Sequence, residues 1–261
     1  MAGSLRYTLP VTDPGAGEVA VAQLLQAGAA GVWERDGDVV AYFAARRDDV
    51  PAGGVWEREP ERDWLAEFKR GLAPVTVGRF TIVPSWLPLP EDAAVTIVLD
   101  PGMAFGTGHH ETTRLCLREL EDSAVEGARV LDVGTGSGIL AIAAALLGAR
   151  EVVAVDTDPL AVAAAADNAA VNGVAIDVRA GSLEAAGEVP FDVVLANLVT
   201  DTLLQIAGEL AQRVAHGGRV VVSGISRERA DEVVAALRDA GLARARTIED
   251  GDWAAVATVR P

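Results

Sequence analysis

The segment 130–138, VLDVGTGSG, constrains the fold of this chain more than any other. An apolar run that carries Asp132 near its end is followed by glycines at alternate positions, Gly134, Gly136 and Gly138. Glycines between a strand and a helix let the backbone approach a ligand without a Cβ in the way. The segment therefore predicts a strand, a tight turn and a helix at the edge of a nucleotide-sized binding site, and we take Asp132, Gly134 and Gly136 as candidates that bind this ligand.

An acidic residue, Asp156, follows the next apolar run at residues 151–155. In a strand–turn–helix–strand unit, a carboxylate about 20 residues past the glycines lies beside the ribose of the ligand. A turn that binds nothing is the simpler alternative, and the position of Asp156 argues against it. A dinucleotide fingerprint would need its third glycine at Ile139, so the pattern instead resembles the first motif of S-adenosylmethionine-dependent methyltransferases with a Rossmann-like fold.

Composition limits the class of protein. The chain has 261 residues, 50% of them hydrophobic, which suffices for one large domain and a small companion. No apolar run approaches the roughly 20 residues that span a bilayer, and the first residues lack the apolar core of a signal peptide. The single cysteine, Cys116, excludes an internal disulfide and a thiolate zinc site. We expect a cytoplasmic location.

The net charge of −16 bears on the choice of partner. An acidic surface repels nucleic-acid phosphates and attracts basic partners, although it also keeps a protein soluble without any partner. We therefore expect a basic protein partner and no direct contact to nucleic acid. We also expect a monomer, with no contact to a membrane and no metal site.

Residues 1–56 predict a small α+β domain, with strands at 5–9, 31–34 and 39–44 and a helix at 18–27. The charged segment 57–72 has an apolar stripe at Trp64, Leu65 and Phe68 and predicts a linker helix. We assign residues 73–261 to the methyltransferase domain.

Strands and helices alternate through this larger domain, which favours a parallel sheet covered on both faces. A short turn at 250–252 makes the last two strands an antiparallel hairpin. We therefore predict the α/β, Rossmann-like sheet of class I methyltransferases, parallel with a C-terminal antiparallel hairpin. The expected strands are 75–83, 95–99, 129–133, 152–155, 176–180, 191–196, 219–224, 244–249 and 253–259, and the expected helices are 112–123, 139–147, 159–170, 202–214 and 228–240.

The glycine-rich segment 100–113, DPGMAFGTGHHETT, is a candidate lid over the cofactor. It carries an apolar pair, Met103 and Phe105, among glycines that include Gly106, and such a pair has little reason to be exposed. Thr113 stands near the point where the next helix would be capped. We therefore take Phe105, Gly106 and Thr113 as cofactor-binding candidates.

Ser182 and the adjacent histidines His109 and His110 are further polar residues that we considered for a site. Ser182 follows a predicted strand, where an adenine edge would lie, and is a further cofactor-binding candidate. His109, His110 and Glu111 could suggest a metal, but adjacent side chains point apart and no third ligand lies at a useful spacing. A structural or capping role for the two histidines is favoured.

Asn197, in the segment LANLVT, ends another predicted strand. Methyltransferases that act on flat nitrogens usually follow such a residue with Pro-Pro and an aromatic residue, whereas Leu198 and Val199 stand here. An aliphatic amine needs no flat clamp, only an acceptor that orients it and the loss of its proton. Asn197 is therefore the catalytic candidate, with a plain strand-ending turn as the alternative; Asp201 and His110 are weaker candidates for proton removal.

Together these motifs resemble the PrmA family, methyltransferases of the large-subunit ribosomal protein L-eleven. The matching segments are 63–86, 100–113, 130–149, 155–159 and 196–204. The resemblance implies a small substrate-recognition domain, a linker and a catalytic domain that transfers methyl groups from S-adenosylmethionine to lysine or N-terminal amines. It also implies cofactor contacts at Thr113, Gly134, Asp156 and Asn197. Thr135 stands where many members have cysteine.

Other functions stay open from the sequence. A methyltransferase for a different protein or a small-molecule amine would share every cofactor feature. A nicotinamide oxidoreductase is disfavoured by Ile139, and a non-catalytic adaptor would leave Asn197 without a purpose.

Overall fold

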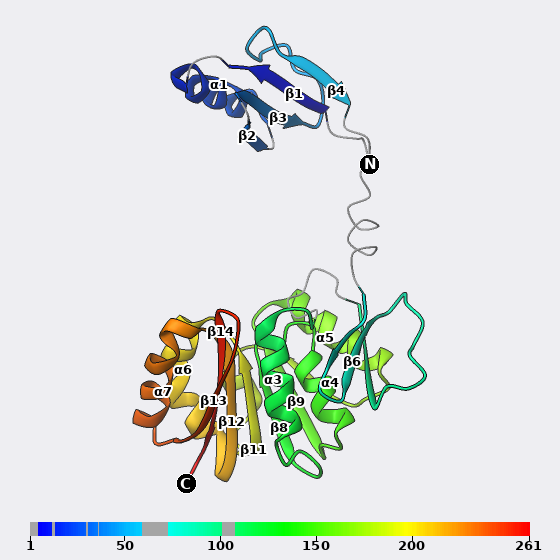
Figure 1. Ribbon diagram of the computed structural model, residues 1–261, viewed down its shortest axis with the longest axis vertical. Coiled ribbons are helices and arrows are strands. Elements are labelled where there is room, and N and C mark those ends of the chain that lie inside the picture. The colour runs from blue at the N-terminus through cyan, green and yellow to red at the C-terminus, as the bar shows by residue number, and fades with distance from the viewer. Residues whose placement is uncertain (1–4, 12–13, 30, 36, 59–72, 101–107) are drawn as a thin grey trace. The chain divides into compact units, whose positions relative to one another are not determined.

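The computed structural model describes residues 5–11, 14–29, 31–35, 37–58, 73–100 and 108–261. The chain divides into two compact units, Met1–Leu72 and Ala73–Pro261, which are drawn in Figure 1. Most of the expected linker helix, residues 59–72, lies outside the described residues, so the predicted domain boundaries stay a prediction. Among the described residues, no helix is both long enough and apolar enough to cross a membrane.

The first unit is a four-stranded antiparallel sheet in the order β2-β3-β1-β4, with one helix packed on it. Its core contains Tyr7, Leu24 and Phe43. Strand β4 differs from the prediction, which had residues 57–58 in a helix. It pairs with β1, far away in the chain, and such a pairing leaves no local pattern in the sequence. The elements are β1 (Leu5–Pro10), α1 (Pro14–Gln26), β2 (Gly31–Arg35), β3 (Asp38–Phe43) and β4 (Val55–Arg58).

The second unit is built on a seven-stranded sheet in the order β10-β9-β8-β11-β12-β14-β13. The first five strands pair in parallel, and the pairs β12–β14 and β14–β13 are antiparallel. The predicted class I methyltransferase sheet is thereby confirmed. The strands are β8 (Arg129–Val133), β9 (Glu151–Asp156), β10 (Asp177–Ala180), β11 (Phe191–Asn197), β12 (Val214–Ser226), β13 (Ala243–Asp250) and β14 (Trp253–Val259).

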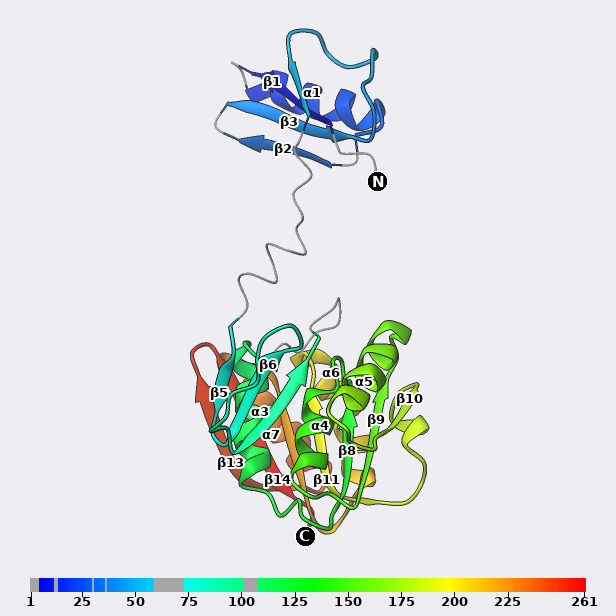
Figure 2. The ribbon, with the colours of Figure 1, turned by 90° about the vertical axis from the view of Figure 1, so that its right-hand side faces the viewer.

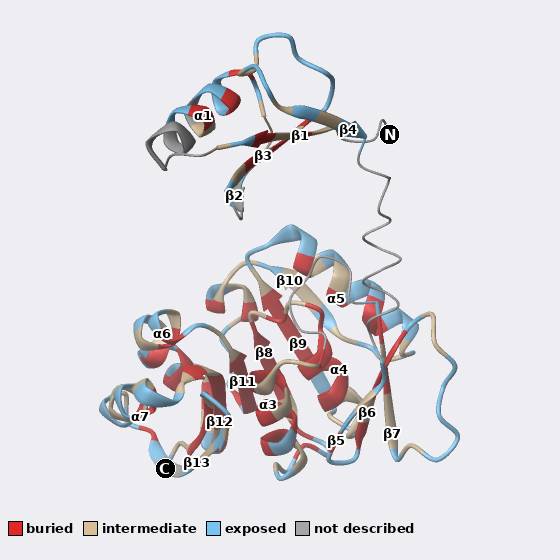
Figure 3. Ribbon diagram, turned by 45° about the horizontal axis from the view of Figure 1, so that its top comes forward, coloured by how far each residue is buried: buried red, intermediate tan, exposed pale blue. Residues whose placement is uncertain are grey.

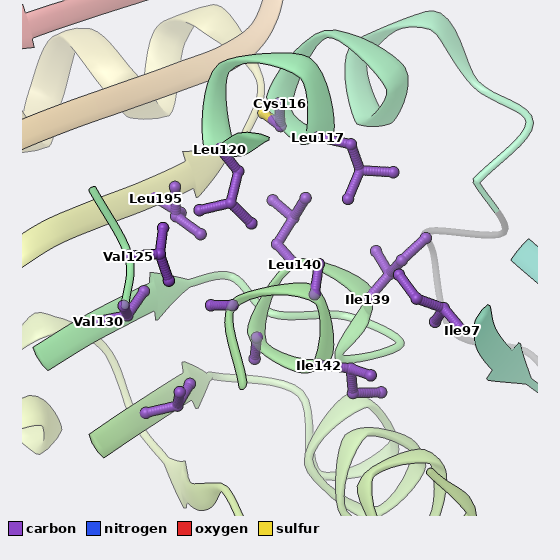
Figure 4. Packing of buried hydrophobic residues seen from close by; sticks show 14 of the residues in the cluster. Ile97, Cys116, Leu117, Leu120, Val125, Val130, Ile139, Leu140, Ile142 and Leu195 are labelled. Atoms are coloured by element: carbon purple, nitrogen blue, oxygen red, sulfur yellow. The ribbon is translucent and has the colours of Figure 1, made fainter. Parts of the chain in front are cut away.

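Helices cover both faces of this sheet, and Figure 3 shows the central strands β8, β9 and β11 largely buried. One apolar cluster joins the sheet to α3, α4 and α5, and a second joins it to α6 and α7. The first cluster includes the buried Cys116, beside Leu117 and Leu120 of α3 (Figure 4), where burial raises the pKa of its thiol. The helices are α3 (Glu111–Glu121), α4 (Ile139–Leu146), α5 (Pro159–Val171), α6 (Thr200–Arg213) and α7 (Ala230–Asp239), with short 3-10 turns η1 (Leu183–Ala186) and η2 (Arg227–Arg229).

A separate three-stranded sheet flanks α3, α4 and α5, and its strands β5 and β6 are visible in Figure 2. The single strand expected at 75–83 is wrong: β5 (Val75–Val77) and β6 (Phe80–Pro84) form a hairpin, and β6 then pairs in parallel with β7 (Val95–Leu99). The hairpin turns at Gly78, whose φ of 55° lies in the left-handed region. A glycine there marks the turn that the apolar pattern concealed.

Helix α5 packs directly behind the glycine turn between β8 and α4. Gly138, the N-cap of α4, has φ 83°, and a Cβ at this position would lie 3.1 Å from both the Cα and the Cβ of Ala165 in α5. Glycine is thus required at this position both for its backbone conformation and for the close helix contact.

Gly138→Ala should therefore destabilise the fold more than Gly173→Ala. Gly173 follows α5 with φ 66°, and a Cβ added there would have no neighbouring atom within 4 Å, so its substitution tests the backbone conformation alone. We expect a loss of about 1–2 kcal/mol in the free energy of unfolding for Gly173→Ala, and about 1–2 kcal/mol more for Gly138→Ala. Urea denaturation measures both, and equal losses would contradict the proposed helix contact.

Candidate active site

A cavity of about 680 Å³ opens at the carboxyl ends of β8, β9 and β11. Here the strand order reverses, because β9 lies on one side of β8 and β11 on the other. In open α/β sheets this reversal point forms the ligand crevice. The cavity is therefore where the fold itself predicts a binding site.

The glycine turn forms the floor of the cavity. The backbone N–H groups of Gly134 and Thr135 both donate to the carbonyl of Val155 in β9, at 2.9 and 3.1 Å. Gly134 and Gly136 line the cavity with φ values of 69° and 56°. The turn is thus held against the neighbouring strand while its backbone faces the cavity.

Asp156 is fixed by two backbone donors. Its Oδ2 accepts from the N–H of Gly136 at 2.9 Å, and its Oδ1 accepts from the N–H of Asp158 at 2.9 Å. The side chain lines the cavity and is partly exposed. Each carboxylate oxygen can accept a second hydrogen bond, so Asp156 is poised to receive a pair of vicinal hydroxyl groups.

Asp132 lies beneath the turn rather than in the cavity lining. Its Oδ2 accepts from the hydroxyl of Thr135 at 2.6 Å and from the N–H of Ala141 at 3.2 Å. Its Oδ1 is buried and has no hydrogen-bond partner among the described residues. Burial raises the pKa of this carboxyl from 3.8 to about 6. A direct contact with the cofactor stays a prediction.

Asn197 and Thr113 meet in the wall of the cavity, although they are far apart in the sequence. The Nδ2 of Asn197, at the end of β11, donates to the hydroxyl of Thr113, in the first turn of α3, at 3.4 Å. Because the amide nitrogen is directed to Thr113, the Asn197 side-chain oxygen remains an acceptor. Ser182, the N-cap residue of the turn η1 that follows β10, also lies in the lining.

The structure adds an aromatic pair that the sequence analysis missed. Trp253, the first residue of β14, lines the cavity with its ring centroid 5.0 Å from that of His110. Arg114 holds the two segments together, since it donates to the carbonyl of His109 at 2.6 Å and to Asp250 at 3.0 Å. The sequence of β14 contains no glycine and gives no local indication of a binding site.

His110 also caps α3, and its Nδ1 accepts from the N–H of Thr112 at 3.3 Å. The predicted structural or capping role is confirmed for His110, which is the N-cap residue of α3. Asp201 lies outside the lining, is 74% exposed and pairs with Arg229 at 2.8 Å, so the structure does not bring it to Asn197. Phe105 and Gly106 lie outside the described residues.

The lining fits S-adenosylmethionine. A carboxylate with free lone pairs suits the ribose hydroxyls, and the backbone of Gly136 permits close approach, whereas Leu198 packs beside Gly134. Apolar walls from Val133, Ile139 and Leu140 suit the purine or the methionine chain. The carboxylate of Asp132, which is ionised above its pKa of about 6, places a negative charge beneath the turn, and this charge suits a cationic ligand.

Asp132→Asn tests the buried charge. In the folded state the pKa of Asp132 lies above its ordinary value of 3.8. Below about pH 4 the carboxyl is protonated in both the folded and the unfolded state, and its contribution to the free energy of unfolding is then fully present. This contribution is lost as the pH rises through 6. The neutral amide avoids this loss and can still accept from Thr135. We expect the variant to be about 1–3 kcal/mol more stable at pH 8, with a smaller advantage at pH 5, in urea denaturation. A variant less stable than the parent at pH 8 would contradict a buried ionised carboxylate.

Comparisons with known proteins agree with this geometry. Residues 16–261 match the family described as "Ribosomal protein L11 methyltransferase (PrmA)". The chain is 41% identical over 254 residues to the "Ribosomal protein L11 methyltransferase" of Thermus thermophilus, with 97% of each chain covered. It is 45% identical over 213 residues to the protein of the same name from Symbiobacterium thermophilum, with 81% of this chain and 69% of that one covered.

A solved structure shares the fold. The ribosomal protein L11 methylase of Lactobacillus delbrueckii subsp. bulgaricus superimposes with a TM-score of 0.68 at 35% identity, covering 72% of this chain and 99% of that one. The sequence match, the sheet and the cavity at its reversal point lead to the same assignment. The chain belongs to the PrmA family of ribosomal protein L11 methyltransferases.

Proposed function

We propose that this chain transfers methyl groups from S-adenosylmethionine to lysine or N-terminal amines of ribosomal protein L11. The observation that carries the proposal is one continuous cavity. Its lining includes Asp156 and the glycine turn, which we assign to a cofactor end, and Asn197, His110 and Trp253, which we assign to an acceptor end. A donor and an acceptor amine can therefore meet inside one cavity.

Bound S-adenosylmethionine supplies an electrophilic methyl group on its sulfonium. The residues at the cofactor end orient that group: Asp156 would accept from the ribose hydroxyls, while the peptide units of Gly134 and Gly136 lie beneath. We propose that Thr113 and Ser182 complete this end of the site. Positioning of two reactants in this way supplies much of the rate of a displacement reaction.

The acceptor amine must be neutral before it attacks. Lysine has an ordinary pKa near 10.4 and an α-amino group one near 8, so either must lose a proton. The apolar side chains of Leu198 and Ile206 in the lining lower the pKa of an amine that enters, because burial disfavours the charged form. The Asn197 oxygen then accepts the remaining N–H and aims the lone pair.

Among the described residues, none of those that line the acceptor end is a carboxylate, Glu111 lies beside His110 but outside the lining, and the Nδ1 of His110 already accepts from the backbone of α3. The proton can therefore leave to water before the amine is enclosed. A methyl transfer by this route depends on a site that desolvates and orients the amine, and it does not depend on a strong base.

The remaining assignments concern the whole molecule. We propose that residues 1–56 recognise the substrate protein, that 57–72 link them to the catalytic domain, and that the protein acts as a cytoplasmic monomer without direct contact to nucleic acid. The net charge of −16 supports a basic partner, because it attracts positive protein surfaces and repels phosphates.

The test of the function is incubation of the purified protein with ribosomal protein L11 and S-adenosylmethionine, followed by intact-protein and peptide mass spectrometry. We expect mass steps of one methyl group on lysine or N-terminal peptides. Methylation of a different protein or a small amine, with none on L11, would replace the proposed substrate and keep the reaction class. Binding of NAD in place of S-adenosylmethionine would overturn both.

Asn197→Ala should lower kcat on the order of 100-fold, because the amine loses the acceptor that orients it. Thr113→Val keeps Asn197 but removes the hydroxyl that holds its amide, so we expect a smaller loss, about tenfold. Steady-state kinetics give kcat, and calorimetry gives the Kd for S-adenosylmethionine. If Asn197→Ala keeps its turnover while its cofactor affinity is unchanged, the assignment of Asn197 is wrong.

A further inference from the structure

One side of helix α5 forms a line of contacts behind the cofactor end of the cavity. Ala161 lines the cavity, and Ala165 packs against Gly138. One turn further on is Asn168, whose side chain is only 2% exposed, and then Asn172. Two asparagines on the inner side of an otherwise alanine-rich helix are costly unless their amides are paired.

The amide of Asn168 joins two segments that border the site. Its Oδ1 accepts from the N–H of Asp100 at 2.9 Å, and its Nδ2 donates to the carbonyl of Ser137 at 2.9 Å and to that of Asp100 at 3.5 Å. Ser137 belongs to the glycine turn, and Asp100 follows directly on β7. One side chain thus connects the turn to a different sheet through the helix between them.

Asn172 makes similar contacts without reaching the turn. Its Oδ1 accepts from the N–H of Val98 at 2.8 Å, and its Nδ2 donates to the carbonyls of Val98 and Asn168 at 2.6 and 2.7 Å. The two asparagines therefore carry the same chemistry on the same helix and bind the same end of β7. They differ in that only Asn168 holds the glycine turn.

The contact between Asn168 and Ser137 bears on cofactor binding because of the position of Ser137. Ser137 lies between Gly136, whose N–H orients Asp156, and Gly138, which starts α4. Both glycines adopt positive φ values, so the turn has little intrinsic stiffness. We infer that Asn168 is a positioning residue for the cofactor: through the Ser137 carbonyl it fixes the turn that holds Asp156. The inference rests on the proposed binding of S-adenosylmethionine.

The experiment compares matched variants of the full chain. Asn168→Asp and Asn172→Asp each keep the acceptor for β7 and replace two N–H donors with a carboxylate oxygen. Asn168→Ala and Asn172→Ala provide a second pair if a buried carboxylate prevents folding. Calorimetry at a temperature well below every Tm gives the Kd for S-adenosylmethionine, and thermal unfolding without ligand gives the Tm.

We expect substitutions at both positions to lower the Tm, since both lose hydrogen bonds that are at least partly buried. Only the Asn168 variants should weaken the binding of S-adenosylmethionine, by about tenfold, whereas the Asn172 variants stay within about twofold of the parent. Equal effects on Kd at the two positions, or none at Asn168, would overturn the inference. Absence of binding to the parent chain would instead refute the proposed cofactor, so the two failures are distinguishable.

Discussion

The pairing of the glycine turn with strand β9 is the constraint on which the site depends. Val155 accepts from Gly134 and Thr135, and Asp156 accepts from Gly136. The glycine turn that follows β8 is thus held against β9 by hydrogen bonds. The same turn orients the carboxylate of Asp156 at the end of β9. A ligand at this edge meets a backbone and an acid whose geometry is already set, so little ordering is needed on binding.

A buried charge lies under that turn. Asp132 is held by Thr135 and by the first turn of α4, yet one of its oxygens has no partner among the described residues, and burial raises its pKa to about 6. An apolar residue would serve stability better at this position. Its retention in the structure is consistent with a cationic ligand above the turn, whose positive charge would favour the ionised form.

The C-terminal hairpin supplies part of the acceptor end of the cavity. Because β14 runs antiparallel to β12, its first residue, Trp253, reaches the same edge as the carboxyl ends of the parallel strands. Arg114 then joins the turn of that hairpin, at Asp250, to the segment that carries His110. The C-terminal hairpin therefore contributes a wall of the cavity as well as an edge of the sheet.

The amino-acid pattern alone predicts the sheet, the glycine turn and Asp156, since each depends on local periodicity or on spacing within one βαβ unit. It merged β5 with β6 and missed β4, whose pairing with β1 joins segments far apart in the chain. Only the tertiary structure brought Asn197 to Thr113 and Trp253 to His110, because contacts between residues far apart in the chain follow from strand order and leave no pattern in a single sequence.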